Sequence, residues 1–77
     1  MEYQFLFFTH TGAIKFSRKM KEKGINCELM PVPRSMSSNC SVSAKVLLDG
    51  EVKDIIDKEV EKVFILDQDA PKLIYEA

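Results

Sequence analysis

The chain has few residues that carry metal or redox chemistry, because its 77 residues include only two cysteines and one histidine. Cys27 and Cys40 form no C-x-x-C pair, and with His10 they cannot supply the four ligands of a structural zinc site. We therefore expect no metal and no cofactor. The same scarcity predicts reduced thiols in a cytoplasmic protein, with a Cys27–Cys40 disulfide as the alternative.

Other absences argue against whole classes of function. No apolar run approaches the ~18 residues of a transmembrane helix. The start, Met1-Glu2-Tyr3-Gln4, has no basic region and no cleavage site, so we expect neither export nor membrane attachment. The three glycines are isolated and form no phosphate-binding motif. No Ser, Asp or Glu stands at a recognisable spacing from the single histidine, which argues against a catalytic triad.

The charges nearly balance, and the net charge of −1 argues against general nucleic-acid binding. Their distribution is uneven: residues 1–40 carry six basic and three acidic side chains, and residues 41–77 carry five and nine. Five basic residues crowd one expected helix, namely Lys15, Arg18, Lys19, Lys21 and Lys23. They predict either a solvated helix face or a docking surface for an acidic partner.

Hydrophobic patterns predict four strands, over residues 3–8, 25–30, 42–48 and 63–66. The first is a dense apolar run, which is typical of a strand covered on both faces. The second and third alternate in character, as half-buried strands do. The tail after the fourth strand is expected to form a turn and, at most, a short edge pairing at Leu73-Ile74-Tyr75.

Two helices connect these strands in the prediction. The first begins near Gly12 or Ala13 behind a cap from Thr9 or Thr11, and ends at Gly24 in the left-handed conformation. The second follows a cap at Asp49. Its apolar stripe consists of Val52, Ile55, Ile56 and Val60.

This order of elements, β-α-β-β-α-β, predicts one α+β domain over residues 1–77, with its core at about 3–66 and a C-terminal tail. The expected fold is ferredoxin-like, a four-stranded antiparallel sheet with two helices on one face.

The connection between the second and third expected strands is longer than a hairpin needs. It has roughly ten residues where two to five suffice, and its Pro31 and Pro33 stiffen it ahead of Arg34. Cys40 follows a hydroxyl-rich stretch. A cysteine among polar residues near a cation favours the thiolate, which is the nucleophile. We therefore predict Cys40 as the reactive residue and interpret Cys27, on an alternating strand, as an inert apolar side chain.

The remaining loop residues are predicted to bind what Cys40 carries. The Arg34 guanidinium can bind an anionic group, and hydroxyl and backbone N–H groups after it can add hydrogen bonds. The residues that offer these groups are Ser37, Ser38, Asn39 and Ser41. His10 is interpreted as the residue that opens the first helix or, alternatively, as a proton donor near the loop.

Several segments together resemble a known family: the strand Phe5-Leu6-Phe7-Phe8, the helix end Lys21-Glu22-Lys23-Gly24-Ile25, and the block Pro31-Val32-Pro33-Arg34, Ser37-Ser38 and Cys40. The chain is similar, over about residues 3–66, to the small bacterial family of selenium/sulfur (Se/S) carrier-like proteins. The resemblance implies that Cys40 accepts sulfur or selenium and passes it on, with Arg34, Ser37 and Ser38 shaping its site. The family pattern continues with glycine after the cysteine, where this chain has Ser41.

Three functions stay open at this point. In the first, which we expect, Cys40 takes the chalcogen from a cysteine desulfurase-type donor, holds it as a persulfide or perselenide, and gives it to a protein acceptor. Such a protein is a carrier more than a turnover enzyme, and we expect a monomer or weak homodimer. In the second, the domain binds an anion or a protein through Arg34 or through Lys15 and Lys19. In the third, Cys40 is a redox-sensing thiol.

Overall fold

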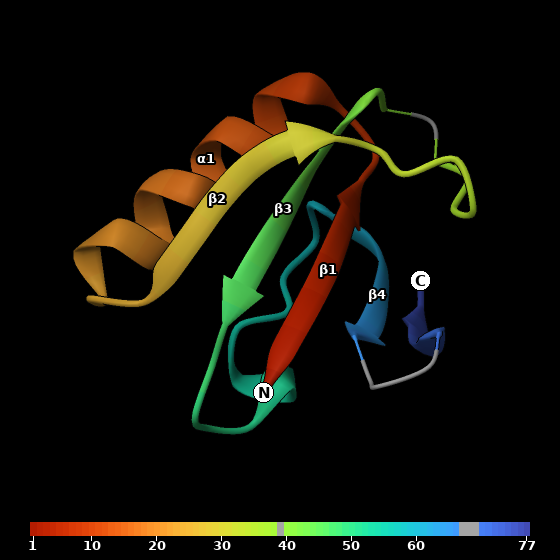
Figure 1. Cartoon of the computed structure of the whole chain (residues 1–77). Coiled ribbons are helices and arrows are strands. Elements are labelled where there is room, and N and C mark those ends of the chain that lie inside the picture. The colour runs from red at the N-terminus through yellow and green to blue at the C-terminus, as the bar shows by residue number, and fades with distance from the viewer. Residues whose placement is uncertain (39, 67–69) are drawn as a thin grey trace.

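The fold is a sheet with an α-helix packed on one face (Figure 1). The structure, a computed structural model, describes residues 1–38, 40–66 and 70–77. The elements are β1 (Glu2–Phe7), α1 (His10–Glu22), β2 (Asn26–Pro31), β3 (Val42–Leu47), the 3-10 turn η1 (Val52–Asp54), β4 (Val60–Leu66) and β5 (Pro71–Glu76). The predicted α+β class is confirmed.

The sheet has five strands in the order β2-β3-β1-β4-β5, and every neighbouring pair is antiparallel. β1 and β2 therefore run parallel with β3 between them, and α1 connects the two. The prediction of four strands is wrong, because the C-terminal residues extend the sheet. β5 pairs with β4 from Lys62↔Glu76 to Leu66↔Pro71, which is longer than the short edge pairing expected there.

Helix α1 begins at His10, two residues before the predicted start near Gly12, but the residues that flank its two ends are ones that the sequence singled out. The Thr9 hydroxyl caps it by accepting a hydrogen bond from the Gly12 amide at 2.9 Å. At the other end Gly24 has φ +72°, the left-handed conformation in which glycine carries no steric penalty. No helix among the described residues is long and apolar enough to cross a membrane.

The core lies between α1 and the sheet. The Phe16 side chain, 1% exposed, packs its ring 4.8 Å from that of Phe5 and 5.1 Å from that of Phe7, measured between centroids. Such tilted aromatic pairs stabilise beyond the area they bury. Other members of this cluster come from α1, β1, β3, β4 and the segment after β3, namely Tyr3, Ala13, Met20, Ala44, Val46, Leu48, Ile55, Val60 and Val63.

The second predicted helix does not form. Between β3 and β4 the structure has only the short turn η1, so the two-helix ferredoxin-like prediction is wrong. The apolar stripe nevertheless faces the core, because Ile55 is buried and Val52 and Ile56 pack against the core. All the stripe residues are β-branched, which weakens a helix. Asp57 then favours a turn, since its Oδ1 accepts from the Glu59 amide at 2.9 Å.

The opposite sheet face has its own buried residues at one end. Gln4 and Leu6 alternate with the core residues of β1 and so point away from α1, yet both are buried. Lys62 pairs with Leu6 in the β1–β4 ladder and donates a hydrogen bond to the Ser37 carbonyl at 3.1 Å. The loop between β2 and β3 is thereby held at this end of the face, where β1 also ends (Figure 1).

Candidate functional site

The loop over residues 32–41 has the length that the sequence predicted. The β2–β3 ladder ends at the pair Pro31↔Val42, and one further hydrogen bond, from the Val32 amide to the Ser41 carbonyl at 3.1 Å, extends it. Beyond this stem the chain turns back through a bond from the Met36 amide to the Pro33 carbonyl at 3.0 Å. The described part of the loop is thus a hairpin extension, with Cys40 at its base.

The tip of the loop carries Arg34, between the two ends of the Pro33–Met36 turn. Its side chain is exposed, and it makes no hydrogen bond or ion pair with any residue that the structure describes. Met36, at the end of the same turn, is buried. The contact between the guanidinium and Cys40 that the sequence suggested is therefore not observed among the described residues, because the turn directs Arg34 to solvent.

Cys40 is buried, with 7% of its surface exposed, whereas reactive thiols usually lie in partly exposed positions. Two backbone amides define its position. The Cys40 amide donates to the Ser38 hydroxyl oxygen at 3.2 Å, and the Val42 amide donates to the Cys40 Sγ at 3.4 Å. Cys40 is a free thiol.

Ser38 connects the cysteine to the ends of two strands. Its Oγ lies 2.9 Å from the carbonyl oxygen of Phe7 and 2.8 Å from Oε1 of Glu61. A hydroxyl has one proton, so it donates to one of these acceptors at a time while accepting from the Cys40 amide. The predicted loop residue Ser38 therefore binds the protein itself, at the end of β1 and the beginning of β4.

The other predicted loop residues are in different situations. Ser37 is exposed, and Lys62 Nζ lies 3.4 Å from its hydroxyl as well as 3.1 Å from its carbonyl oxygen. Ser41 is also exposed and has a negative φ, so serine at the family's glycine position needs no left-handed conformation. Asn39 lies outside the described residues.

The base of the loop is fixed by buried polar groups. The Ser43 hydroxyl, fully buried, lies 3.2 Å from the carbonyl oxygens of both Met30 and Pro31, and it accepts a hydrogen bond from Gln4 Nε2 at 2.6 Å. These bonds join β1, β2 and β3 where the loop leaves the sheet. Pro31 is the last residue of β2, one residue beyond the strand expected over 25–30, and Pro33 supplies the carbonyl that closes the turn at the loop tip.

His10 is the first residue of α1, which confirms the interpretation as the residue that opens the helix. Its side chain is exposed and lines a shallow, mainly apolar surface hollow next to the base of the loop. The other lining residues are Leu29, Met30, Pro31, Ser41 and Val42. The structure gives His10 no hydrogen bond to a described residue, so its role as a proton donor stays a prediction.

Cys27 differs from Cys40 in its surroundings. It lies on β2, is half-buried, and packs against the core beside α1. Burial raises the pKa of the Cys27 thiol, and a hydrogen bond with Ser17 opposes the shift in part. A raised pKa favours the thiol over the thiolate, which agrees with the interpretation of Cys27 as unreactive.

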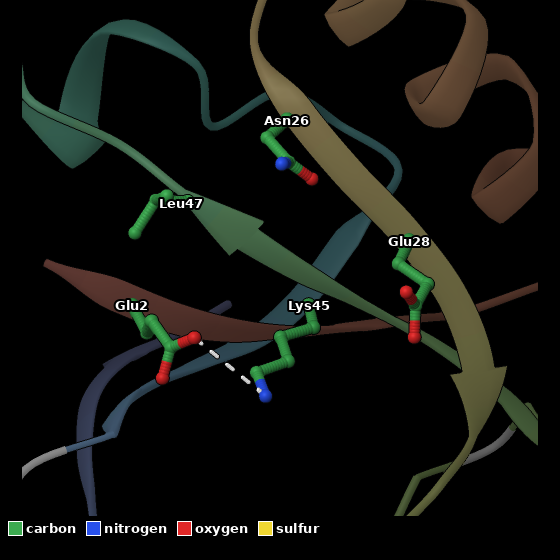
Figure 2. A pocket seen from close by; sticks show the side chains of 5 residues that line it. All are labelled: Glu2, Asn26, Glu28, Lys45 and Leu47. Carbon is green, nitrogen blue, oxygen red and sulfur yellow. Dashed lines mark ion pairs between the residues drawn. The ribbon is translucent and has the colours of Figure 1, made fainter.

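A second hollow lies on the open sheet face, toward the opposite end of β3 (Figure 2). Lys45 is its central residue, and its ammonium is directed to the Glu2 carboxylate at 3.6 Å while Glu28 lies on the neighbouring strand. Both partners of this ion pair are substantially exposed, and such pairs contribute about 0–1 kcal/mol. Its lining includes no cysteine, and it is a solvated charged surface.

Two residues that fasten the loop were not identified from the sequence. Glu61 and Lys62 lie at the beginning of β4 and are far from the loop in sequence, and nothing in their spacing indicates the contact. Only the register of β4 beside β1 brings them to Ser37 and Ser38. Among the described residues, no three His, Cys, Asp or Glu side chains gather where a metal ion could bind.

The arrangement is a free thiol that receives an amide hydrogen bond, at the base of a loop tied to two strands. Comparison with curated proteins found no match, and comparison with solved structures found none. A family model described as "Putative Se/S carrier protein-like" matches residues 2–68 of the 77-residue chain. This match includes β1, α1, the loop with Cys40, and β4. The chain belongs to the Se/S carrier protein-like family.

Proposed function

We propose that the protein carries sulfur or selenium on Cys40. The observation that carries the proposal is the placement of this thiol: its Sγ accepts a hydrogen bond from the Val42 amide, within the range that the family model matches. The proposal includes a reducing compartment, the cytoplasm, because transfer requires Cys40 as a free thiol.

The transfer is an exchange of one sulfur–sulfur bond for another. The Cys40 thiolate attacks the outer sulfur of a persulfide on the donor protein, the donor's sulfur–sulfur bond breaks, and the donor cysteine leaves as a thiolate. Cys40 now holds the outer sulfur as a persulfide, and nothing is oxidised or reduced overall. In the second step an acceptor thiolate attacks the same outer sulfur and Cys40 leaves as a thiolate. A donor that bears selenium in the outer position reacts in the same way.

The Val42 amide supports both steps in this scheme. Hydrogen bonds to an ionised group are stronger than those between neutral groups, so the bond to Sγ is worth more when Cys40 is a thiolate. Cys40 is a thiolate when it attacks and again when it leaves. The proposed donor is a cysteine desulfurase-type enzyme, because such an enzyme holds a persulfide with a transferable outer sulfur.

Intact-mass spectrometry after incubation with a cysteine desulfurase and cysteine tests the proposal. The wild-type protein is expected to gain one sulfur atom that a reductant removes. Cys40→Ser is expected to gain none, whereas the control Cys27→Ser is expected to load like the wild type, because Cys27 packs against the core. Loading that survives Cys40→Ser in a folded protein refutes the assignment of Cys40. A repeat with a selenium donor then separates sulfur from selenium as the cargo.

A further inference from the structure

The sheet has an open edge along β2. This strand is the outermost on its side of the sheet, and its ladder with β3 runs without a register shift from Asn26↔Leu47 to Pro31↔Val42. Four of its six residues are exposed and the other two are half-buried, so the strand is accessible to another chain. The other edge strand, β5, has a register shift and begins at Pro71, and both features protect an edge from pairing. The edge that can accept another strand is therefore β2.

The backbone groups of Cys27 and Leu29 point outward from this edge. Hydrogen-bonded and non-hydrogen-bonded pairs alternate along an antiparallel ladder, and the bond from the Val32 amide to the Ser41 carbonyl at 3.1 Å shows which pairs are hydrogen-bonded. Even-numbered residues of β2 therefore direct their backbone groups to β3, and Cys27 and Leu29 direct theirs away from it. In the part of the chain that the structure describes, no other strand pairs with them. Their amides and carbonyls are thus open to a second backbone.

The side of the edge that faces α1 is apolar. The Leu29 side chain lines a hollow together with His10, the first residue of α1, and farther along α1 Ser17 forms a hydrogen bond with Cys27. Ile14 lies about one helical turn from both His10 and Ser17, so it belongs to the same side of α1. Ile14 and Leu29 are each 39% exposed, although both are large and apolar. They offer a surface for apolar side chains of an added strand.

The other side of the edge carries an acidic group without a cation. Glu28 lies on the open sheet face, where Lys45 is its neighbour on β3 (Figure 2). Lys45 is directed instead to the Glu2 carboxylate, at 3.6 Å. Glu28 forms no ion pair with any residue that the structure describes. A basic side chain directly opposite Glu28 on an added strand would supply the missing charge.

We propose that the β2 edge binds an extended segment, with the pattern apolar–basic–apolar, of the protein that exchanges sulfur with Cys40. The segment adds an antiparallel strand to the sheet, and its backbone pairs with Cys27 and Leu29. Because side chains alternate along a strand, the two apolar ones lie on the α1 side and the basic one lies opposite Glu28. The inference rests on the proposed carrier function for the identity of this partner, whereas the recognition of the segment follows from the edge itself.

The open edge ends close to the proposed reactive residue. The hollow that Leu29 and His10 line also includes Ser41 and Val42, the two residues that follow Cys40. The Val42 amide donates the hydrogen bond to the Cys40 Sγ, at 3.4 Å. A protein that binds along β2 is thereby brought next to the thiol with which it exchanges sulfur.

Titration with a short peptide, followed by the amide chemical shifts of the isotope-labelled protein, tests this inference. The probe is acetyl-Thr-Val-Lys-Val-Thr-amide, and it is expected to shift the amide signals of Cys27 and Leu29 and to slow their exchange with solvent. The same peptide with glutamate in place of lysine is expected to bind about fivefold more weakly, because like charges opposite each other repel. N-methylation of both valines removes the donors to the edge and is expected to abolish binding.

A charge exchange on the protein is the sharpest comparison. Glu28→Lys is expected to reverse the order, so that the glutamate peptide binds more tightly than the lysine peptide. Glu28 is exposed, so this change leaves the core intact. Glu76→Lys, an exposed acidic residue on β5, is the matched control and is expected to leave both affinities unchanged.

Several results would overturn the inference. They are no shift at Cys27 and Leu29 with millimolar peptide, equal binding of the N-methylated peptide, or an unchanged peptide preference in Glu28→Lys. Shifts of the β2 signals with protein concentration alone would also overturn it, since they would assign the edge to a second copy of the chain.

The sulfur-loading assay tests the identity of the partner. The lysine peptide is expected to slow loading of Cys40 by the donor in proportion to the occupied fraction of the edge. Peptide binding that leaves the loading rate unchanged would assign the edge to another protein and overturn the partner named here. Failure of the carrier function is distinct from this, because the protein would then gain no sulfur even without peptide.

Discussion

Replacement of Gly12 by alanine tests how closely the chain before β4 lies against the first turn of α1. A Cβ at this position would meet Glu59 Oε1 at 2.8 Å, Glu59 Cβ at 3.1 Å and Thr9 Oγ1 at 3.1 Å. Only glycine fits without displacement of these atoms. The Glu59 carboxylate can rotate away, but its Cβ is fixed by the backbone, which accepts a hydrogen bond from the Phe8 amide at 3.3 Å.

The two effects of Gly12→Ala oppose each other. Alanine stabilises a helix interior by about 1 kcal/mol relative to glycine. Against this, overpacking costs about 1–3 kcal/mol, and displacement of the Thr9 hydroxyl weakens a cap whose loss costs about 0.5–2 kcal/mol. We expect the steric terms to dominate and the free energy of unfolding to fall by about 1–2 kcal/mol. For a domain of this size that lowers Tm by about 4–16 °C.

Thermal and urea unfolding followed by circular dichroism measure this change. Gly50→Ala is the matched control, because its Cβ would have no neighbour within 4 Å, and it is expected to leave the stability within about 0.5 kcal/mol of wild type. A double-mutant cycle with Glu59→Gly, which removes both Glu59 atoms, should reduce the cost of Gly12→Ala. An increase in stability for Gly12→Ala alone would refute the close packing of this segment on α1.

Two further predictions concern the buried Ser43 and the half-buried Cys27. Ser43→Ala removes the acceptor of the Gln4 amide and is expected to cost about 1–3 kcal/mol. Adding Gln4→Leu should recover part of this in urea unfolding, and strictly additive losses would contradict the pairing. Burial raises the pKa of the Cys27 thiol, so the folded protein holds this proton more tightly than the unfolded chain. Stability should therefore decline as pH rises through the ordinary and then the raised pKa of this thiol, less so in Cys27→Ala. An equal decline in both proteins would show that Cys27 is not responsible.

The parts of the fold that the sequence predicted depend on local signals. The first helix was placed correctly because a threonine cap, an apolar face and Gly24 all occur within one segment. The prediction of a second helix over the apolar stripe from Val52 to Val60 is wrong because it depended on spacing alone. Its spacing reports which side chains are buried, and both a helix and an irregular segment can bury Ile55. Weak helix propensity and the Asp57 turn decide between the two.

At the candidate site, too, features set by neighbouring residues could be predicted from the sequence, whereas contacts between distant residues could not. The extra length of the loop, the prolines and the position of Cys40 can be read from consecutive residues. The partners of Ser38 cannot, since Phe7 and Glu61 are 31 and 23 residues away along the chain. Their approach depends on the order β3-β1-β4 in the sheet, which places the ends of β1 and β4 beside the loop. Prediction of the burial of Cys40 would have required that topology.

The separation of Arg34 from Cys40 changes how the loop is understood. Proximity in sequence suggested one site in which the guanidinium stabilises the thiolate. In the structure Arg34 is exposed on the turn at the tip, whereas Cys40 is buried at the base and takes its hydrogen bond from Val42. The Arg34 guanidinium forms no hydrogen bond or ion pair with a described residue, so it is available to a protein that approaches the loop tip.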